Sequence, residues 1–243
     1  MVMKFDTIQS LWSDSKLGIV GRLCCTSYMA NGHEFHLYTY GHVEDVPEGV
    51  VIKDANEIVP QSDLYRFKLP AQFSDWFKYH LLLKHGNWWV DMDTVCLRPF
   101  DFVDAVVFVE ERLDTTRPDY INGDFVKVPV GSPIMSWCID QCKERSDPKG
   151  TWKVLKDYCE LGPWMFTAAA KQFNIHPQSY HKFFNPAHVN PSNPAGLWFD
   201  GAVQLPEDIY GVHFWRCGRK ESDWRIGTEN SIFEQLRRRY SVN

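Results

Sequence analysis

Two aspartates, one residue apart, directly follow a run of large apolar residues in the stretch "GNWWVDMDTV", residues 86–95. The apolar run predicts a buried strand, with at least one of Trp88 and Trp89 in its core. On an extended strand Asp91 and Asp93 share a face, and a turn at the end of the strand brings both carboxylates to one cation. Hard oxygen ligands of this kind suit Mg²⁺ or Mn²⁺. The residues therefore indicate a divalent-metal site at the edge of a sheet.

Two different kinds of enzyme build such a site. In the first, Asp91 is a nucleophile that takes up a phosphoryl group; in the second, the aspartate pair holds the metal that carries a nucleotide's diphosphate. The stretch "DMDTV" resembles the first motif of haloacid-dehalogenase-like phosphotransferases, which need an acidic pair after a later strand. The available pairs are Glu110-Glu111, which follow much too soon, and Glu207-Asp208, which follow a proline. The sequence therefore favours the metal clamp and keeps the phosphatase as an alternative.

The composition is that of a globular protein. Its 243 residues, 44% of them apolar and 23% charged, fit one large α/β domain with a sizeable core. A formal net charge of −5 argues against a nucleic-acid partner. The seven cysteines lack any Cys-x-x-Cys spacing, which is typical of reduced thiols in the cytosol. There is no signal-peptide pattern and no stretch of roughly 18 apolar residues, so we expect a cytoplasmic protein.

The first half of the chain alternates between strand and helix patterns. The best helix, over 73–86, has Ser74 or Asp75 as the expected cap and Gly86 as its end. Such β-α-β alternation predicts an α/β sheet whose site lies at the carboxyl ends of its strands. Strands are predicted over 5–12, 33–40, 50–54, 87–90 and 105–111, and helices over 16–30 and 73–86.

The pattern is less regular after residue 120. One or two strands in "YINGDFVKVPVGSPIM" lead to a helix predicted from Ser132 to Glu144, and residues 152–173 predict two short helices split by Gly162-Pro163. Residues 183–208 are rich in Asn, Pro and Gly and predict a long loop. A final strand (209–218) and a final helix (229–240) complete the chain. Because no repeat or linker divides it, we expect a single domain, 1–243.

The stretch "SDWFKYHLLLKHGNWWVDMDTVCLRP" (74–99) resembles the sugar-binding region of DXD-containing glycosyltransferases of the Och1-like and capsular-polysaccharide type, family 32-like. The family pattern is Ser-Asp, a basic residue and Tyr, a helix, Gly-Gly-x-Tyr-x-Asp-x-Asp, then Pro. Weaker similarity extends to "IQSLW", "VPVGSPIM", "LGPWMFTAA" and "YGVHFW". The resemblance implies a GT-A (Rossmann-like) fold, with a mixed central sheet flanked by helices, and a retaining hexosyltransferase that uses a nucleotide sugar.

The same resemblance implies a metal site and an acceptor site. Asp93 would coordinate Mn²⁺ or Mg²⁺ directly, and Asp91 would contact the metal shell or the hydroxyls of the donor. His213, in "GVHFW", would supply a further metal ligand. Gly162 and Pro163 would border the acceptor.

The donor contacts implied by the resemblance come from four segments. The end of the first strand would lie against the nucleobase, and the helix predicted over 73–86 would hold the donor sugar or ribose. The Asp-x-Asp segment would contact the donor hydroxyls, and a loop near the C-terminus would face the pyrophosphate. A lysine stands where the family usually has arginine, which replaces a planar fork by a point charge. Asn replaces the second glycine of the family, and Asn adopts left-handed backbone more readily than most residues. The implied donor-binding residues are Trp12, Ser13, Asp75, Lys78, Asp91, Gly218 and Lys220. Arg219 is a competitor for the contact with the pyrophosphate. The residue that stands in place of the family's second glycine is Asn87.

Retention of configuration at the transferred sugar has two possible routes. The acceptor attacks from the leaving group's own face, or a carboxylate first forms a covalent intermediate. Asp119 and Asp124 are candidates for that carboxylate, but their sequence contexts are typical of turns. We therefore expect front-face attack, with the diphosphate oxygen taking the acceptor's proton.

The resulting hypothesis is a metal-dependent retaining glycosyltransferase that moves a sugar from a nucleotide sugar, UDP favoured, to a saccharide or glycolipid acceptor in surface polysaccharide synthesis. Residues 1–110 would bind the donor, and residues 111–243 the acceptor, with a C-terminal loop for metal and pyrophosphate. The alternatives are the phosphatase and a catalytically silent nucleotide-sugar binder. Arg237, Arg238 and Arg239 are either a solvated helix end or a contact with anionic lipid at the inner face of a membrane.

Overall fold

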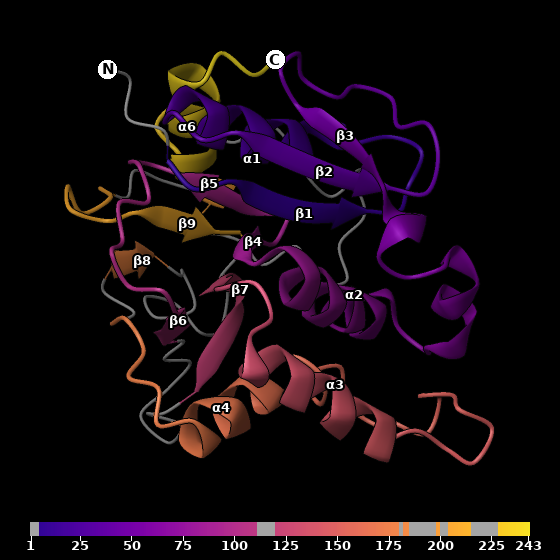
Figure 1. Cartoon of the computed structure of the whole chain (residues 1–243). Coiled ribbons are helices and arrows are strands. Elements are labelled where there is room, and N and C mark those ends of the chain that lie inside the picture. The colour runs from indigo at the N-terminus through magenta and orange to yellow at the C-terminus, as the bar shows by residue number, and fades with distance from the viewer. Residues whose placement is uncertain (1–4, 111–119, 180–181, 185–197, 200–203, 215–227) are drawn as a thin grey trace.

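The computed structural model describes residues 5–110, 120–179, 182–184, 198–199, 204–214 and 228–243 (Figure 1). Asp119, Gly218, Arg219, Lys220 and most of the predicted loop 183–208 lie outside these residues. The described strands are β1 Ile8–Trp12, β2 Phe35–Thr39, β3 Val51–Asp54, β4 Asn87–Val90, β5 Thr94–Cys96, β6 Val107–Glu110, β7 Ile121–Val128, β8 Phe183–Phe184 and β9 Gly211–His213. The helices are α1 Gly18–Ala30, α2 Pro70–His85, α3 Pro133–Glu144, α4 Pro163–Gln172 and α6 Ile232–Arg239, with 3₁₀ turns η1 Ala55–Glu57 and η2 Gln61–Arg66.

The main sheet has the strand order β3-β2-β1-β4-β7-β6. Its first four strands are parallel, β7 runs antiparallel to β4, and β6 runs antiparallel to β7. The mixed sheet predicted from the sequence is therefore confirmed. From β1 the chain builds outward to β2 and β3, and then returns to β4 on the other side of β1. This reversal places a topological switch point between β1 and β4, which is where open α/β sheets form their ligand crevice.

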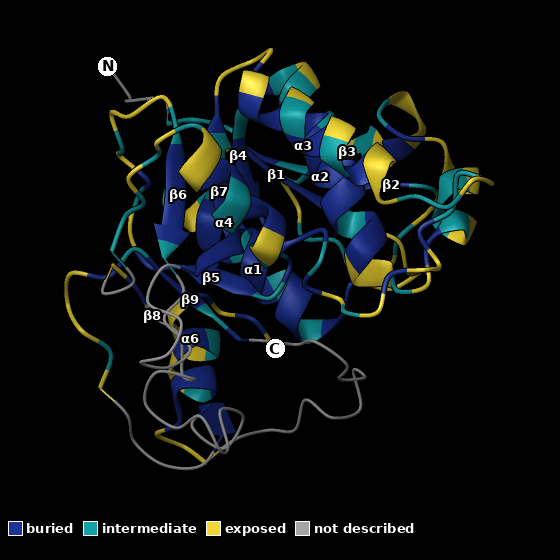
Figure 2. Ribbon diagram, turned by 90° about the horizontal axis from the view of Figure 1, so that it is seen from below, coloured by how far each residue is buried: buried dark blue, intermediate teal, exposed yellow. Residues whose placement is uncertain are grey.

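Helices cover both faces of the main sheet (Figure 1). Helix α1 packs on one face, and α2, α3 and α4 pack on the other. Strand β4 feeds both cores in alternation, because Trp88 and Val90 join the α1 core while Trp89 joins the α2 core. Both indoles are at most 1% exposed, so both belong to the strand core, where at least one was expected. Figure 2 shows the central strands and the inner sides of these helices as buried.

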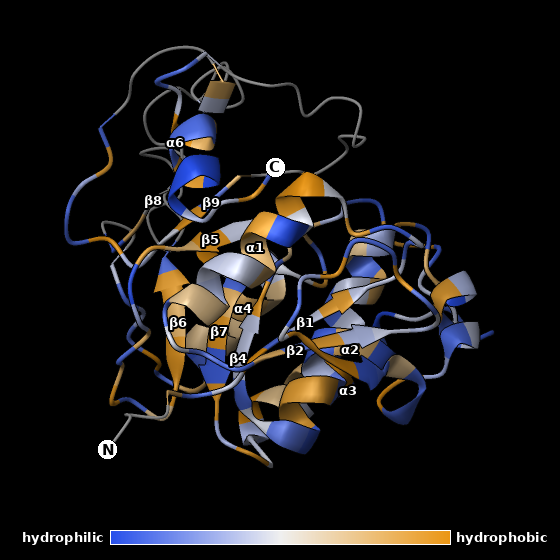
Figure 3. Cartoon of the chain, turned by 90° about the horizontal axis from the view of Figure 1, so that it is seen from above, coloured by the Kyte–Doolittle hydropathy of each residue, from blue (hydrophilic) through white to orange (hydrophobic). Residues whose placement is uncertain are grey.

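A smaller sheet, β5-β9-β8, joins the C-terminal part of the chain to the turn that follows β4. Strands β5 and β9 are antiparallel, with Thr94 opposite His213. Behind them a third core takes apolar residues of α6, which appears in Figure 3 as a largely hydrophilic helix with one hydrophobic side. This pairing brings His213 next to Asp93, although 120 positions separate them in the sequence.

Helix α2 begins earlier than predicted. Leu69 is its N-cap residue and Pro70 occupies its first turn, so the prediction that Ser74 or Asp75 caps the helix is wrong. Proline at the first position presets the helical φ angle and needs no hydrogen-bond partner for its nitrogen. Asp75 consequently lies one turn inside the helix, where it is 8% exposed. Gly86 ends the helix as predicted, and Asn87 has φ 66°, the left-handed backbone expected for it.

Residues 152–173 contain one helix, α4, in place of the two that were predicted. Before Gly162 the chain forms turns. Glu160 accepts the backbone N–H groups of Lys156 and Asp157, and Asp157 accepts that of Cys159. Such bonds from side chain to backbone compete with helix formation, and the predicted first helix is replaced by these turns.

Two negative findings apply to the described part of the chain. None of its helices combines the length and apolar character needed to cross a membrane. Its cysteines are buried free thiols, as the spacing predicted: Cys24, Cys25, Cys96, Cys138, Cys142 and Cys159.

Candidate functional site

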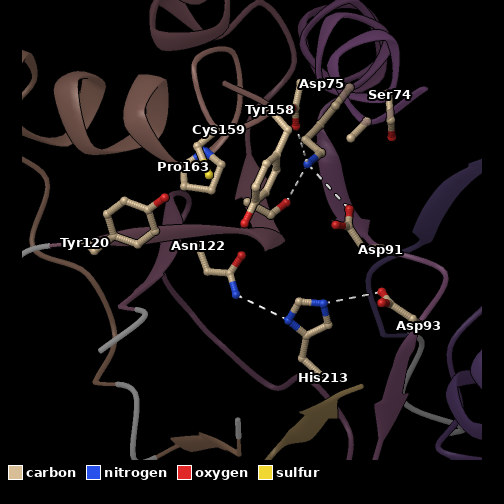
Figure 4. Close-up of a pocket in the computed structure, with 13 residues that line it drawn as sticks. Ser74, Asp75, Asp91, Asp93, Tyr120, Asn122, Tyr158, Cys159, Pro163 and His213 are labelled. Atoms are coloured by element: carbon tan, nitrogen blue, oxygen red, sulfur yellow. Dashed lines mark hydrogen bonds and ion pairs between the residues drawn. The ribbon is translucent and has the colours of Figure 1, made fainter. Parts of the chain in front are cut away.

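Two cavities meet at the Asp-x-Asp turn, at the carboxyl ends of β1 and β4. One, of about 230 Å³, contains Lys78 and is called the Lys78 cavity (Figure 4). The other, of about 350 Å³, contains the residues that end β1 and is called the Trp12 cavity. Asp91 and Asp93 line both cavities, so the two aspartates stand at the junction. The site therefore lies at the topological switch point of the sheet.

A closed turn holds the two aspartates. Thr94 donates both its backbone N–H (3.1 Å) and its hydroxyl (2.8 Å) to the Asp91 carbonyl. On the flanking strands, the Asp91 N–H donates to the Asp124 carbonyl (3.0 Å) and the Phe214 N–H donates to the Asp93 carbonyl (2.8 Å). Backbone hydrogen bonds from β7 and from Phe214, which follows β9, therefore fix the backbone positions of Asp91 and Asp93.

Two neighbours orient the Asp91 carboxylate. The Trp89 indole N–H donates to Asp91 Oδ1 at 2.6 Å, and Lys78 Nζ lies 3.4 Å from the same oxygen. The Asp91 side chain nevertheless remains 37% exposed. The carboxylate is therefore aimed by Trp89 and Lys78 and is still open to the junction of the cavities.

Lys78 is a buried cation surrounded by acceptors. Its side chain is 2% exposed, and Nζ contacts Asp75 Oδ1 at 3.1 Å and the Gly123 carbonyl at 2.7 Å, in addition to Asp91. Nζ also lies over the rings of Trp89 and Phe166, 5.1 and 5.5 Å from their centroids. Burial alone would lower the pKa of Lys78, but the carboxylates of Asp91 and Asp75 outweigh it and raise that pKa. The ammonium is therefore kept charged in a dry environment.

Asp75 is held between Lys78 and the start of α4. Burial raises the pKa of Asp75 to about 6, against the lowering effect of Lys78. A Cβ atom on Gly162 would come within 2.6 Å of Asp75 Oδ2, so the close approach of α4 to this carboxylate requires glycine. The next residue, Pro163, lines the Lys78 cavity. The structure thus brings the two predicted acceptor residues to the predicted donor residue Asp75.

His213 lies between two carboxylates. Its Nε2 is 3.4 Å from Asp93 Oδ1, and its Nδ1 is 2.8 Å from Asp124 Oδ2 (the Asp93 contact is drawn in Figure 4). Burial would lower the pKa of His213, but Asp124 and Asp93 raise it well above its ordinary value. Burial raises the pKa of Asp124, and His213 opposes that shift. The prediction that His213 stands at the metal end of the site is compatible with this geometry.

The interpretation of Asp124 as a turn residue is wrong. Asp124 lies inside β7, where it is 1% exposed and forms part of a strand paired with β4. The Asn122-Gly123 pair before it has the composition of a turn but is itself part of the strand. As a candidate nucleophile Asp124 is poorly placed, because its side chain does not line the Lys78 cavity and already contacts His213.

The residues that could hold a metal are Asp93 and His213, with Asp91 beside them. The described residues contain no group of three or more His, Cys, Asp or Glu side chains that could enclose an ion. Asp93 Oδ1 and His213 Nε2 face each other, and they suit a cation that takes only two of its ligands from the protein. Magnesium-like ions at nucleotide sites take their other ligands from phosphates and water, so a partial protein shell of this kind is adequate. Metal removal is a direct test of this arrangement.

The Trp12 cavity contains the other predicted donor residues. Trp12 is 8% exposed and its indole N–H donates to the Lys16 carbonyl at 3.0 Å, while Ser13 lies at the open side. Ser10, on β1, donates its hydroxyl to the Val90 carbonyl at 2.7 Å and so joins β1 to β4 beside this cavity. Trp12 and Ser13 therefore line the same cavity as Asp91 and Asp93.

Sequence reasoning missed the aromatic side of the Lys78 cavity. Tyr120, Tyr158 and Cys159 line this part of the cavity (Figure 4). Tyr158 is 48% exposed. The signal was available in "DYCELGP", where a tyrosine lies four residues before the family-like Gly162, but helix prediction over this segment concealed it.

The C-terminal arginines are engaged within the protein. Arg237 forms an ion pair with Glu234 (3.1 Å), Arg238 contacts Glu229, and Arg239 donates to the Leu97 carbonyl (2.8 Å). These contacts favour the solvated helix end among the two predicted roles.

Comparison with known proteins places the fold. No family model matches the chain, and no curated protein matches it. Among solved structures, the chain is similar to PaToxG glycosyltransferase, with 16% identity over 70% of this chain and 69% of that one and a TM-score of 0.53. It is also similar to the apo form of the glycosyltransferase GlyE of Streptococcus pneumoniae TIGR4, with 10% identity over 98% of this chain and a TM-score of 0.56. The chain spans 60% of the length of GlyE. At this level of identity the likeness shows the fold alone, and the predicted GT-A fold is confirmed.

Proposed function

We propose that the protein is a metal-dependent retaining glycosyltransferase that moves a hexose from a nucleotide sugar, with UDP favoured, to a saccharide or glycolipid acceptor. The observation that carries this proposal is the junction of the Lys78 and Trp12 cavities at Asp91 and Asp93. A nucleotide sugar has three parts in a row, and the site offers two cavities with an acidic turn between them. Cavities of this size suit a small polar ligand.

The two cavities would divide the donor. The nucleoside would occupy the Trp12 cavity, and the sugar would occupy the Lys78 cavity beside Asp75. The diphosphate would then cross the junction, next to Asp93 and His213. This division agrees with the expectation that residues 1–110 bind the donor, although His213 comes from the second half of the chain.

A bound Mn²⁺ or Mg²⁺ would neutralise the charge that develops on the leaving diphosphate. Asp93 and His213 would hold that ion, and Asp91 would contact its shell or the donor. Lys78 has a different role from the phosphate contact that a basic residue suggests, because Asp75, Asp91 and the Gly123 carbonyl surround its ammonium. It orients two carboxylates and balances their charge, so that they meet the sugar hydroxyls without a solvent shell.

Front-face attack is the route that the residues support for retention. The carboxylates that line the Lys78 cavity among the described residues are Asp75, Asp91 and Asp93, and each of them contacts a cationic side chain. A covalent nucleophile would have to give up such a contact. In the front-face route the acceptor oxygen bonds to the anomeric carbon, the bond to the diphosphate breaks, and the acceptor's proton passes to the diphosphate oxygen.

Neither alternative function is favoured by a specific observation. A phosphatase would need a second acidic pair near Asp91. Glu207 lines a separate cavity, and the described residues that line that cavity include neither Asp91 nor Asp93. A silent binder would have the same site without turnover, which only an activity assay separates. A role in surface polysaccharide synthesis, at a membrane face or away from it, remains part of the proposal and rests on the sequence resemblance.

The testing experiment is a thermal-shift panel of UDP, GDP and CMP sugars, each with and without Mn²⁺. One nucleotide class is expected to raise the melting temperature only when the metal is present. At a ligand concentration of 100 times Kd the stabilisation is about 2.7 kcal/mol, or roughly 5–10 °C for a domain of this size. Asp93→Ala should lose the metal-dependent part of the shift. The absence of a response to every nucleotide would reject the transferase.

A further inference from the structure

Asp124 is a fully buried carboxylate whose function the proposed reaction does not explain. It does not line either cavity at the aspartate turn, and its side chain is 1% exposed. Removing a carboxylate from water is costly unless a partner compensates it. The compensating partner is His213, whose Nδ1 lies 2.8 Å from Asp124 Oδ2.

This contact determines which ring nitrogen of His213 faces the cavity. Nδ1 is paired with the Asp124 carboxylate at 2.8 Å, and Nε2 is the nitrogen that lies 3.4 Å from Asp93 Oδ1. A proton kept at Nδ1 leaves Nε2 as the nitrogen that can ligate a cation once the ring is neutral. Asn122 Nδ2 also approaches Nδ1, at the longer distance of 3.4 Å. The Asp124 carboxylate lies closer to the ring than either Asn122 or the carboxylate of Asp93, so it favours a proton at Nδ1.

Asp124 also contacts the other half of the aspartate turn through its backbone. Its carbonyl accepts the Asp91 N–H at 3.0 Å, and its own N–H donates to Asn122 Oδ1 at 3.3 Å. One residue of β7 therefore touches both sides of the candidate cation site: the backbone reaches Asp91, and the side chain reaches the imidazole that faces Asp93.

We propose that Asp124 is a positioning residue for the cation site, which orients His213 so that Nε2 faces the ion, and that its loss weakens cation binding although every direct ligand is retained. The inference rests on the proposed function only in requiring that the site take a divalent cation. Carboxylates that accept the second N–H of a metal-bound histidine fix its ring and raise its basicity, and their loss typically costs 10–100-fold in metal affinity. Asp124 extends the site beyond the residues that the sequence resemblance implies.

The test measures Mn²⁺ binding directly, without turnover. Free Mn²⁺ is followed by electron paramagnetic resonance in titrations of the wild type, Asp124→Asn, Asp124→Leu and His213→Ala, first with Mn²⁺ alone and then with UDP present. We expect about a tenfold loss for Asp124→Asn, whose amide oxygen still accepts the ring N–H, and about a 100-fold loss for Asp124→Leu, which fills the volume without an acceptor.

A matched control separates positioning from general weakening of β7. Lys127, on the same strand, forms an ion pair with Asp6 (2.7 Å), and neither residue lines the two cavities. Lys127→Met should lower stability without changing Mn²⁺ affinity. Wild-type Mn²⁺ affinity in a folded Asp124→Leu would overturn the positioning role and leave the transferase proposal standing. Absence of Mn²⁺ binding by the wild type would instead reject the metal site itself, and the inference with it.

A second measurement serves if Asp124→Leu fails to fold. Nitrogen-15 spectra of the histidine rings, with the His213 signal assigned from His213→Ala, report the tautomer in the wild type and in Asp124→Asn. The expected wild-type signal is a ring that donates through Nδ1 to Asp124. The spectra are recorded without Mn²⁺ at a pH above the pKa of His213, where the ring is neutral. A wild-type ring that is protonated at Nε2 under these conditions would contradict the proposal.

Discussion

The two sides of the Lys78 cavity are built in opposite ways. The charged side, with Asp75, Lys78, Asp91, Asp93 and His213, comes from α2, the turn after β4 and β9. Its members contact one another, and Lys78 is 2% exposed. On the aromatic side Tyr120 is 7% exposed, whereas Tyr158 is 48% exposed. Under the proposed function, the charged side would perform the chemistry and the side with Tyr158 would recognise the acceptor.

The charged side depends on mutual compensation. Each carboxylate there is close to a cationic group, and each cationic group is close to at least two carboxylates. Removal of one member therefore changes the charge and the orientation of its neighbours. On the aromatic side, replacement of one ring by alanine leaves the net charge of the cavity unchanged. Substitutions should consequently reduce turnover on the charged side and acceptor affinity on the aromatic side.

The largest effect is expected from Asp93→Ala. This change removes one of the two protein groups that face the candidate cation, so kcat should fall about 10³-fold with little change in acceptor KM. The measurement is release of the nucleoside diphosphate at saturating donor and Mn²⁺. Asp140→Ala, at an exposed position of α3, is the matched control and should be fully active. Turnover near the wild-type rate in Asp93→Ala would show that the charged side does not perform the chemistry.

Substitution of Lys78 tests the compensation itself. Lys78→Met leaves Asp75 and Asp91 without their shared cation, so we expect the free energy of unfolding to fall by about 3–5 kcal/mol and kcat by about 100-fold. Lys78→Arg keeps the charge but must fit a larger, planar group against the Gly123 carbonyl and Phe166. It should fold and retain more activity than the Met variant. Chemical denaturation and steady-state kinetics measure the two effects, and equal activity of Arg and Met variants would contradict a charge-balancing role.

The sequence predicted the parts of the site that are local in the chain. Asp91 and Asp93 end one strand, Asp75 and Lys78 share one helix, and the alternation of elements predicted the sheet edge where they meet. Boundaries were less accurate: the proline that begins α2 moved its cap away from Ser74.

The remainder depends on pairings that no local pattern encodes. His213 reaches Asp93 because β9 pairs with β5, and Asp124 reaches His213 because β7 joins the sheet beside β4. Asn122-Gly123 suggested a turn, yet both residues lie in a strand, because tertiary pairing overrides intrinsic preference. The sequence could therefore identify the residue types of the site but not the long-range contact between Asp124 and His213.

A smaller effect should appear in the pH dependence. Burial raises the pKa of Asp75 from 3.8 to about 6, so this group loses its charge where an ordinary aspartate is still ionised. If Asp75 accepts donor hydroxyls as a carboxylate, kcat/KM for the donor should fall about tenfold between pH 7 and pH 5. Asp75→Asn should have lower activity at pH 7 and lack this acid limb. An unchanged acid limb in Asp75→Asn would assign it to another group.

Stability should respond to Asp75 in the opposite direction. A carboxyl whose pKa is raised on folding binds its proton more tightly in the folded state, so its contribution to stability increases as pH falls from about 6 toward 3.8. The activity loss at pH 5 is therefore not explained by unfolding through this group. Thermal melts of the wild type and Asp75→Asn at pH 5 and pH 7 check the sign.

The smallest effect is expected on the aromatic side, from Tyr158→Ala. A sugar ring has an apolar C–H face that can pack on an aromatic ring, and loss of one such contact costs about 1 kcal/mol, or roughly fivefold in binding. Acceptor KM should therefore rise about fivefold, while kcat and the donor KM change little. Tyr65→Ala, which removes a tyrosine that is 72% exposed and lines neither cavity, is the control. If Tyr158→Ala instead lowers kcat and leaves acceptor KM unchanged, the aromatic side takes part in turnover, and the division between the two sides of the cavity is wrong.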